Sequence, residues 1–177
     1  MANFADTFYQ IGTPDKATTD RLFNAFSTHT ELCDVCKALD MPNVARGYVE
    51  LVSKEGDTAL DVALTTTWDE QPAFIAELER LGCDVLWNCE EPGNNYYHSN
   101  IEGGMFGLFK VVTYEEEDYA NTISECVDMV NNFLRDFHRP TYEGKANIYA
   151  LQSFLDEYNA EENIGDDTIK VFQFSKS

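Results

Sequence analysis

The sequence alternates apolar and polar residues on both sides of Gly56-Asp57, and this pattern constrains the fold more than any other feature. The alternation runs through GYVELVSK and TALDVALTTT. A period of two is typical of strands with one buried face, and a Gly-Asp pair between two such runs is typical of a tight turn. We therefore predict a β-hairpin with strands at residues 47–54 and 58–67.

Two helices are expected before this hairpin. The stretch TPDKATTDRLFNAFSTH places apolar residues at helical spacing, and Asp15 or Thr18 is in position to cap its start. The stretch TELCDVCKALDMP predicts a second helix that stops near Pro42. Together they would form an N-terminal helical segment, residues 1–43, followed by an α+β domain, residues 44–177.

The patterns after the hairpin complete an α+β fold. DEQPAFIAELERLG predicts a short helix, with Asp69 as its cap and Gly82 just after its end. CDVLWNCEE and MFGLFKVVTY predict strands, separated by the Gly- and Asn-rich loop PGNNYYHSNIEGG. ANTISECVDMVNNFLRDF predicts a long helix with Phe133 and Phe137 on its buried face, ANIYALQSFLDEYN a last helix, and DDTIKVFQF a last strand. We expect an antiparallel or mixed sheet of four or five strands, with helices on one face and the N-terminal helices added.

One stretch carries a family resemblance. In WDEQPAFIAELERLGCDVLWNCEEPG, a tryptophan at a strand end precedes a proline early in a helix, and a later strand leads into Glu-Pro-Gly. This arrangement resembles the YubB-type ferredoxin-like domain of small phage and plasmid proteins. The matching positions are Trp68, Pro72, Glu91, Pro92 and Gly93, and the resemblance covers about a third of the chain. It implies a mobile-element origin and a ferredoxin-like ββαββα core, and it implies no catalytic activity.

The chain is strongly acidic but has the composition of a folded protein. It holds 32 Asp and Glu residues against 12 Lys and Arg, which gives a formal net charge of -20, and 13% of its residues are aromatic. Disordered acidic tails are poor in aromatic residues, so a folded domain is expected. The charge repels nucleic acid and anionic membranes and attracts basic surfaces. Direct nucleic-acid binding is disfavoured, since Lys and Arg contacts to phosphate supply most of such affinity.

The remaining motifs do not indicate an enzyme or a metal site. Cys33 and Cys36 form a CxxC inside a helical pattern, where we expect them to share one buried face rather than to bind zinc. The sequence has no HExxH, GxSxG or P-loop motif. We therefore expect no catalytic residue, no metal and no cofactor. The start of the chain lacks a signal-peptide pattern, no apolar run is long enough for a membrane span, and five scattered cysteines fit a reducing compartment. The expected location is the cytoplasm of a bacterial host cell.

The densest negative charge lies in YEEEDY, where Glu115, Glu116, Glu117 and Asp118 follow one another. The run falls where a strand is predicted to end and a long helix to begin. Carboxylates in the first turn of a helix interact favourably with its dipole, by about 0.3–1 kcal/mol each, which would explain one or two of them. Four consecutive carboxylates are more than the helix dipole would explain. The alternatives are a solvated helix start and a surface that binds a basic partner.

Further candidates for partner contact lie before this run. Glu90 and Glu91 end a predicted strand and would add to the acidic surface. Tyr96 and Tyr97 lie in the predicted loop, where adjacent tyrosines would make rigid, amphipathic contacts with another protein. We expect these residues and the acidic run to form the partner-binding surface.

In its small size, single domain and strong acidity, the chain is similar to anti-CRISPR proteins and anti-restriction DNA mimics. Our hypothesis is a mobile-element-encoded inhibitor. It would bind a basic nucleic-acid-binding protein, such as a Cas effector or a restriction enzyme, and block its nucleic-acid recognition. A homodimer would be compatible with this role. The alternative is a non-catalytic structural or regulatory accessory domain whose acidity serves solubility, and an enzyme is the least supported class.

Overall fold

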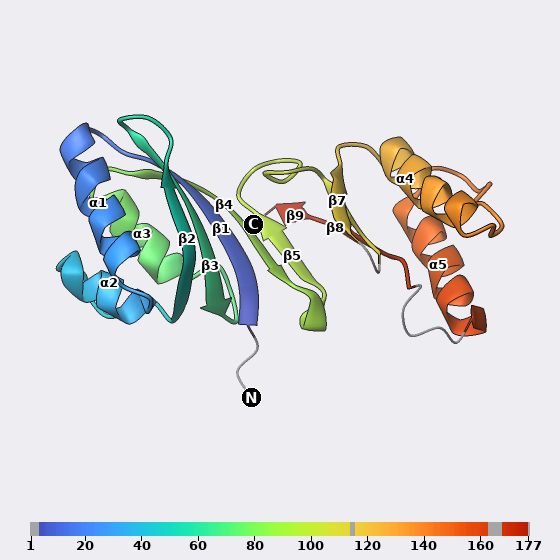
Figure 1. Cartoon of the computed structure of the whole chain (residues 1–177), viewed down its shortest axis with the longest axis horizontal. Helices are drawn as coiled ribbons and strands as arrows, with labels where there is room; N and C mark the ends of the chain where they lie inside the picture. The colour runs from blue at the N-terminus through green and yellow to red at the C-terminus, as the bar shows by residue number, and fades with distance from the viewer. Residues whose placement is uncertain (1–3, 114–115, 163–167, 177) are drawn as a thin grey trace. The chain divides into compact units, whose positions relative to one another are not determined.

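The computed structural model describes residues 4–113, 116–162 and 168–176, and within these residues it has an α+β fold with five α-helices. The chain divides into two compact units, unit 1 up to Ile101 and unit 2 from Glu102 to Lys176 (Figure 1). Within the same ranges, every helix is too short or too polar to cross a membrane.

Unit 1 is built on an antiparallel sheet with helices packed on one of its faces (Figure 1). Five of its strands lie side by side in the order β2 (Gly47–Lys54), β3 (Ala59–Thr67), β1 (Phe4–Gly12), β4 (Asp84–Glu91) and β5 (Tyr96–Ser99). The helices are α1 (Lys16–Thr28), α2 (Leu32–Ala38) and α3 (Pro72–Arg80). Alternate residues of β1 and β3 are buried, and Tyr9 of β1 packs in one core with Phe26 of α1 and Phe74 of α3.

The predicted hairpin is confirmed by β2 and β3, but the sequence did not reveal β1. Its stretch FADTFYQIG buries Ala5 and Thr7 together with larger residues, and a small and a polar residue at buried positions conceal the alternation. β1 pairs with both β3 and β4 and is therefore a central strand of the unit. The expected boundary after residue 43 therefore falls inside unit 1, and the division of the chain lies after Ile101.

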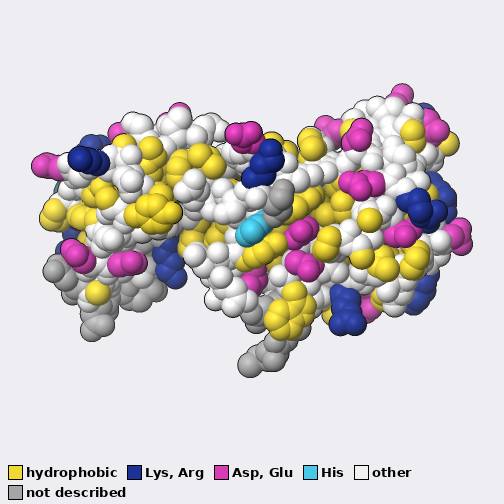
Figure 2. Space-filling model, turned by 180° about the vertical axis from the view of Figure 1, so that it is seen from behind, with side chains coloured by type: hydrophobic (Ala, Val, Ile, Leu, Met, Phe, Trp, Pro, Cys, Tyr) yellow, Lys and Arg dark blue, Asp and Glu magenta, His cyan; other side chains and the backbone are white. Residues whose placement is uncertain are grey.

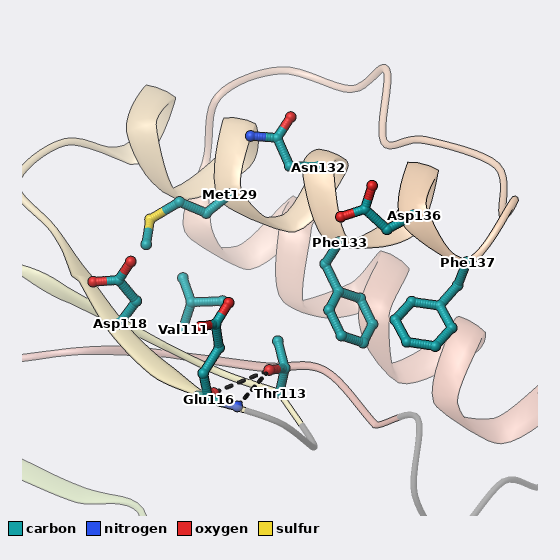
Figure 3. Close-up of a pocket in the computed structure, with 9 residues that line it drawn as sticks. All are labelled: Val111, Thr113, Glu116, Asp118, Met129, Asn132, Phe133, Asp136 and Phe137. Carbon is teal, nitrogen blue, oxygen red and sulfur yellow. Dashed lines mark hydrogen bonds between the residues drawn. The ribbon is translucent and has the colours of Figure 1, made fainter.

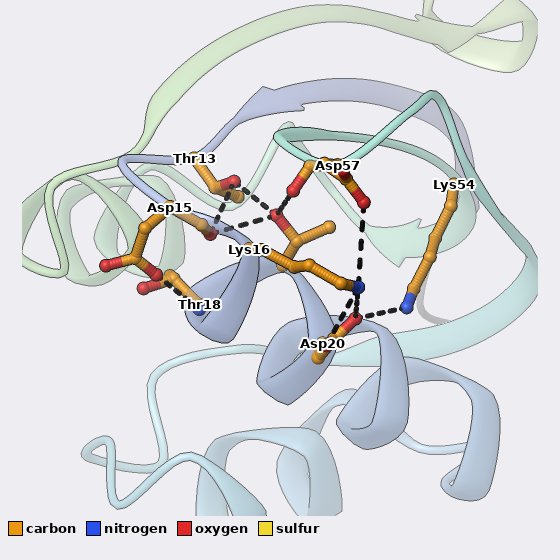
Figure 4. Close-up of polar contacts among 8 residues, drawn as sticks. Thr13, Asp15, Lys16, Thr18, Asp20, Lys54 and Asp57 are labelled. Carbon is orange, nitrogen blue, oxygen red and sulfur yellow. Dashed lines mark hydrogen bonds and ion pairs between the residues drawn. The ribbon is translucent and has the colours of Figure 1, made fainter.

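Polar contacts fix the start of α1 and join it to the end of β2 (Figure 4). Asp15 is the N-cap, as predicted, and its Oδ1 accepts a hydrogen bond from the backbone N–H of Thr18 at 2.8 Å. Asp20 lies 3.1 Å from Lys16 Nζ and 2.5 Å from Lys54 Nζ. Because these pairs are exposed, they contribute little to stability, but they show that several acidic residues of unit 1 are already paired.

The start of α3 differs from the prediction. Gln71 rather than Asp69 is the N-cap, with a φ of 61°, because Pro72 opens the helix. Asp69 Oδ1 supports this turn by accepting hydrogen bonds from the Gln71 backbone N–H at 2.9 Å and from its Nε2 at 3.0 Å. Gly82 follows the end of the helix with a φ of 84°, as predicted.

The predicted loop at residues 92–104 contains regular structure. A single 3-10 turn, η1 (Pro92–Asn94), and Asn95 with a φ of 55° lead into β5, which pairs antiparallel with β4. Asparagine tolerates this left-handed conformation, so the chain reverses direction over a few residues. Tyr96 and Tyr97 are therefore strand residues, not loop residues.

Unit 2 packs two helices on a smaller antiparallel sheet (Figure 1). The strand order is β7 (Glu117–Ala120), β6 (Phe109–Val112) and β8 (Lys170–Gln173), and the helices are α4 (Ile123–Asp136) and α5 (Ile148–Glu162). A two-residue strand, β9 (Ser175–Lys176), ends the described chain. The core of unit 2 combines residues from the sheet and from both helices, among them Val111, Val130, Leu134, Leu151 and Val171.

The sequence had indicated that the acidic run lies at the start of the helix, but in the structure it does not begin α4. Strand β7 lies between the run and the helix, and Thr122 is the N-cap. Thr122 Oγ1 accepts a hydrogen bond from the Glu125 backbone N–H at 3.2 Å, and the Glu125 carboxylate accepts one from Asn121 at 2.9 Å. This reciprocal cap gives the helix its own first-turn acid. The helix dipole therefore does not explain the acidic run.

Candidate functional site

Strand alternation divides the acidic run between two faces of the β6–β7 hairpin. Asp118 lies opposite Val111, and Glu117 lies opposite Val112. Successive strand residues point to opposite faces, so Glu117 is separated from the other two described acids of the run. Glu116 and Asp118 both line a groove against α4. Glu115 lies outside the described residues.

Glu117, predicted as a partner-binding residue, has an ion-pair partner within the protein. Its Oε2 lies 2.6 Å from Lys110 Nζ, and the Lys110 side chain is only 6% exposed. The same Nζ lies 5.6 Å from the centre of the Tyr119 ring. Burying a positive charge is costly unless a negative group compensates it. The local role of Glu117 is therefore to offset the charge of Lys110.

The other wall of the groove is one face of α4. The residues involved are spaced three and four apart, which places them on one side of a helix: Met129, Asn132, Phe133, Asp136 and Phe137. The rings of Phe133 and Phe137 lie 4.7 Å apart, centre to centre, and Phe137 is 37% exposed. The sequence predicted both rings as buried. The fully buried face is instead centred on Cys126, Val130 and Leu134, so the two rings extend beyond the core.

The groove has a volume of about 380 Å³, and its floor is apolar while its rim is acidic (Figure 3). Val111 and Met129 contribute apolar surface beside the two phenylalanine rings. Figure 3 shows the side chains of Glu116 and Asp118 rising from the strand side, opposite α4. Thr113 sets the position of Glu116, because its Oγ1 donates to the Glu116 carbonyl at 3.0 Å and accepts from the Glu116 N–H at 3.2 Å.

Three carboxylates border the groove, and none of them has an ion-pair partner among the described residues. They belong to Glu116, Asp118 and Asp136. The Asp118 carboxylate accepts a hydrogen bond from the neighbouring N–H of Tyr119 at 2.8 Å. Asp136 is the last residue of α4, where the helix dipole disfavours a negative charge. The groove thus concentrates uncompensated negative charge beside exposed aromatic surface.

Sequence reasoning found part of this site and missed its helical wall. Glu116 and Asp118 were predicted as partner-binding residues, whereas Asp136 was not. The signal available for Asp136 was its place between Phe133 and Phe137, whose spacing of four predicts ring contact on one helix face. A carboxylate between two such rings is unusual on a face expected to be buried.

Glu90 and Glu91 are buried, which corrects their prediction as surface carboxylates. Their exposed fractions are 6% and 4%. The physical reason is their place in β4, which lies between β1 and β5, so that Asp6 and Tyr97 flank Glu90 on the two neighbouring strands. In this fold they do not belong to an acidic docking surface.

The two tyrosines predicted as anchors are also held by the fold of unit 1. Tyr97 is 3% exposed. The Tyr96 hydroxyl donates a hydrogen bond to Glu70 Oε2 at 2.7 Å, and its ring stacks on His98 with centres 4.1 Å apart. Burial, followed by this hydrogen bond, raises the pKa of Tyr96 above its ordinary value. In β5, which pairs with β4, Tyr97 is buried, whereas Tyr96 stays partly exposed.

The two cysteines of the CxxC motif differ in burial. Cys36 is buried in the core of unit 1, whereas Cys33 is partly exposed, so the two do not share one fully buried face as predicted. Cys33 lies with Glu31 and Asp34 in the one group within the described ranges whose ligand atoms are close enough to surround a metal ion. Desolvation and the hydrogen bond to Glu31 raise the pKa of the Cys33 thiol, and Asp34 is paired with Lys37 at 2.6 Å.

Comparison with known proteins adds no relative: no family model, curated protein or solved structure matches this chain. The chemistry of the site therefore follows from its geometry alone. An apolar floor with an acidic rim can hold a positively charged group that also offers apolar or planar surface.

Proposed function

We propose that this protein is a mobile-element-encoded acidic inhibitor. It binds a basic, nucleic-acid-binding defence nuclease, such as a Cas effector or a restriction enzyme, and blocks nucleic-acid recognition. The observation that carries the proposal is the groove of unit 2, where Glu116, Asp118 and Asp136 have no ion-pair partner among the described residues. Surfaces that bind phosphate present Arg and Lys, which are the groups such a groove would accept.

Electrostatics supports this choice of partner. A net charge of -20 draws basic surfaces toward the chain and raises the rate of encounter. Long-range attraction alone would not select one partner. The groove adds apolar contact beside the charge, and a cation that fills it excludes water from both.

The family resemblance supports the proposed origin. Trp68 follows β3, Pro72 opens α3, and Glu91 leads from β4 into Pro92-Gly93, an order compatible with a YubB-type domain. A ferredoxin-like core and a phage or plasmid source are part of the proposal. Neither implies catalysis, and we propose a binding protein rather than an enzyme.

The test is displacement of labelled nucleic acid from purified Cas effectors and restriction enzymes, followed by fluorescence polarisation. We expect the wild-type chain to displace nucleic acid from at least one of them, more strongly at low salt than at high salt. The double variant Glu116→Lys/Asp118→Lys should need about tenfold more protein for half displacement. Its matched control is Asp156→Lys/Glu157→Lys, an equal change of charge on exposed residues of α5.

Two results would contradict the proposal. One is that the panel keeps its nucleic acid at every concentration of the chain, while a known inhibitor of each enzyme works. The other is that the groove variant and its charge-matched control lose displacement equally. In the second case the net charge, rather than the groove, would account for the effect.

A second candidate function is a non-catalytic accessory domain whose acidity serves solubility. Asp and Glu side chains are scattered among other side chains on the face drawn in Figure 2, rather than gathered in one patch. Several of them are paired locally, as Asp20 and Glu117 are. For such a domain, reversing Glu116 and Asp118 would lower solubility without changing the activity of any nuclease.

A further inference from the structure

The groove of unit 2 has the size of a side-chain receptor. Its volume of about 380 Å³ is at the low end of the range of about 300–1,000 Å³ that is usual for ligand pockets. A whole helix or a folded loop needs a longer surface. A groove of this size suits one projecting side chain, which is the role that anchor residues play at protein interfaces.

The arrangement of charge favours an extended cation over a metal ion. The carboxylates of Glu116, Asp118 and Asp136 border the same groove but do not form a group whose ligand atoms all lie close together, as far as the described residues are concerned. A divalent cation needs several oxygens at 2.0–2.6 Å from one point. Carboxylates on separate walls instead suit a cation with several donors that point in different directions.

The aromatic floor further narrows the choice. The rings of Phe133 and Phe137 lie 4.7 Å apart at an angle of 34°, and Phe137 is 37% exposed beside Asp136. A guanidinium group is planar, stacks on aromatic faces and carries five N–H donors, whereas an ammonium group is compact and strongly hydrated. Aromatic surface and separated carboxylates are therefore matched better by arginine than by lysine.

We propose that the groove binds the side chain of an arginine in a short basic segment of the partner protein. The guanidinium lies against the ring of Phe137, and its N–H groups donate to Asp136 from α4 and to Glu116 or Asp118 from the strand side. The inference rests on the proposed function, because it assumes a basic protein as the partner. It goes further by naming the residue type that the groove selects.

The chain's own arginine nearby does not fill this position. Arg135 follows Phe133 by two residues on α4, and its NH1 donates to Asn132 Oδ1 at 2.7 Å. Among the described residues, Arg135 forms no ion pair with any of the three groove carboxylates. The groove carboxylates are left for a cation from outside.

The experiment is a titration of the isotope-labelled full chain with short capped peptides, followed by NMR chemical shifts. The peptides are identical except for one central residue, which is arginine, lysine or the neutral isostere citrulline. Arginine and lysine carry the same charge, so general attraction to an acidic protein treats them alike. We expect arginine to bind about threefold more tightly than lysine, or better, and citrulline to be weakest.

Three single variants locate the preference. Phe137→Ala and Asp136→Asn should each bring the arginine-to-lysine ratio of affinities close to one. Asp128→Asn removes an exposed aspartate from the same helix but outside the groove, and it should keep the wild-type ratio. Unchanged spectra away from the groove show that each variant is folded. Because Asp136 is exposed, its amide variant keeps the test informative even where Phe137→Ala does not fold.

Equal affinity for the arginine and lysine peptides would overturn the inference, as would a preference that survives both groove variants. These outcomes are separable from failure of the proposed function. If Glu116→Lys/Asp118→Lys abolishes nucleic-acid displacement while arginine and lysine bind equally, the docking site stands and the arginine selection fails. If arginine is preferred but no nuclease is inhibited, the groove is an arginine-binding site and the proposed inhibitor function is wrong.

Discussion

Asn131 joins α4 to the chain that follows it, and replacing it should weaken unit 2 strongly. Its Oδ1 accepts a hydrogen bond from the Tyr142 backbone N–H at 2.7 Å, and its Nδ2 donates to the Tyr142 carbonyl at 3.0 Å. Asn131 and Tyr142 are each 8% exposed, so water cannot readily replace either bond. These two hydrogen bonds, called the clamp below, hold the helix that forms one wall of the groove.

The size of the effect follows from what Asn131→Ala leaves behind. A buried backbone group that loses its hydrogen-bond partner lowers the stability by about 1–3 kcal/mol. The variant leaves two such groups without a partner, the N–H and the carbonyl of Tyr142. The better helix propensity of alanine returns about 0.5 kcal/mol. Two such groups, less the gain in helix propensity, give an expected net loss of about 1.5–5.5 kcal/mol in the free energy of unfolding of unit 2.

The matched control is Asn132→Ala at the next position of the same helix. Asn132 is exposed, and its side chain accepts a hydrogen bond only from Arg135 among the described residues. Both variants gain the same helix propensity, so their difference isolates the clamp. Asn132→Ala should change stability by less than about 0.5 kcal/mol.

Amide hydrogen exchange measured on peptides from α4 reads the stability of this unit directly. A loss of 2 kcal/mol corresponds to about thirtyfold faster exchange through opening of the helix. Far-UV circular dichroism during urea unfolding gives an independent midpoint. If Asn131→Ala and Asn132→Ala exchange at the same rate, the two hydrogen bonds do not stabilise the unit and the reasoning is wrong.

Three further predictions concern other charges and thiols. Glu117→Gln removes the carboxylate 2.6 Å from Lys110 Nζ and should cost about 1–2 kcal/mol by urea unfolding, less than a fully buried pair because Glu117 is 58% exposed, with no change in arginine preference. Burial raises the pKa of Tyr96, so ionisation of its hydroxyl is disfavoured in the folded state. The stability that this residue supplies is therefore complete below about pH 10 and declines above it. Tyr96→Phe should flatten this decline in the free energy of unfolding, measured by urea unfolding up to about pH 11. Burial raises the pKa of the Cys126 thiol to about 12, so a thiol reagent at neutral pH should modify the partly exposed Cys33 first, as peptide mass spectrometry would show.

The parts of the fold that local patterns specify were predicted well. The β2–β3 hairpin and the helices α1 and α2 follow from periodicity and capping residues within each segment. β1 was missed because Ala5 and Thr7 occupy buried positions, where a pattern search expects large apolar side chains. β5 and β7 have four residues each, which is too short for an alternation to stand out from loop sequence.

The groove could be predicted only in part, because two of its determinants are not local. Asp118 lies in β7 and Glu116 just before it, whereas Asp136 ends α4 and Phe137 follows it. Only the packing of the helix on the sheet brings them together. The exposure of Phe137 also depends on tertiary structure. A sheet of three short strands covers the helix face centred on Val130 and leaves the ring of Phe137, just after the end of α4, partly outside the core.

The acidic run shows why charge in a sequence does not translate directly into a charged surface. A run placed in a strand is divided by the pleat, so Glu117 offsets Lys110 on one face while Glu116 and Asp118 join Asp136 on the other. Charges scattered over the rest of the chain act at long range, and salt screens them beyond about 10 Å. They therefore govern mainly the rate of association, while desolvated contacts inside the groove govern dissociation. For the function we propose, selection of a partner would then depend on the three groove carboxylates and the Phe133–Phe137 pair, rather than on the net charge of -20.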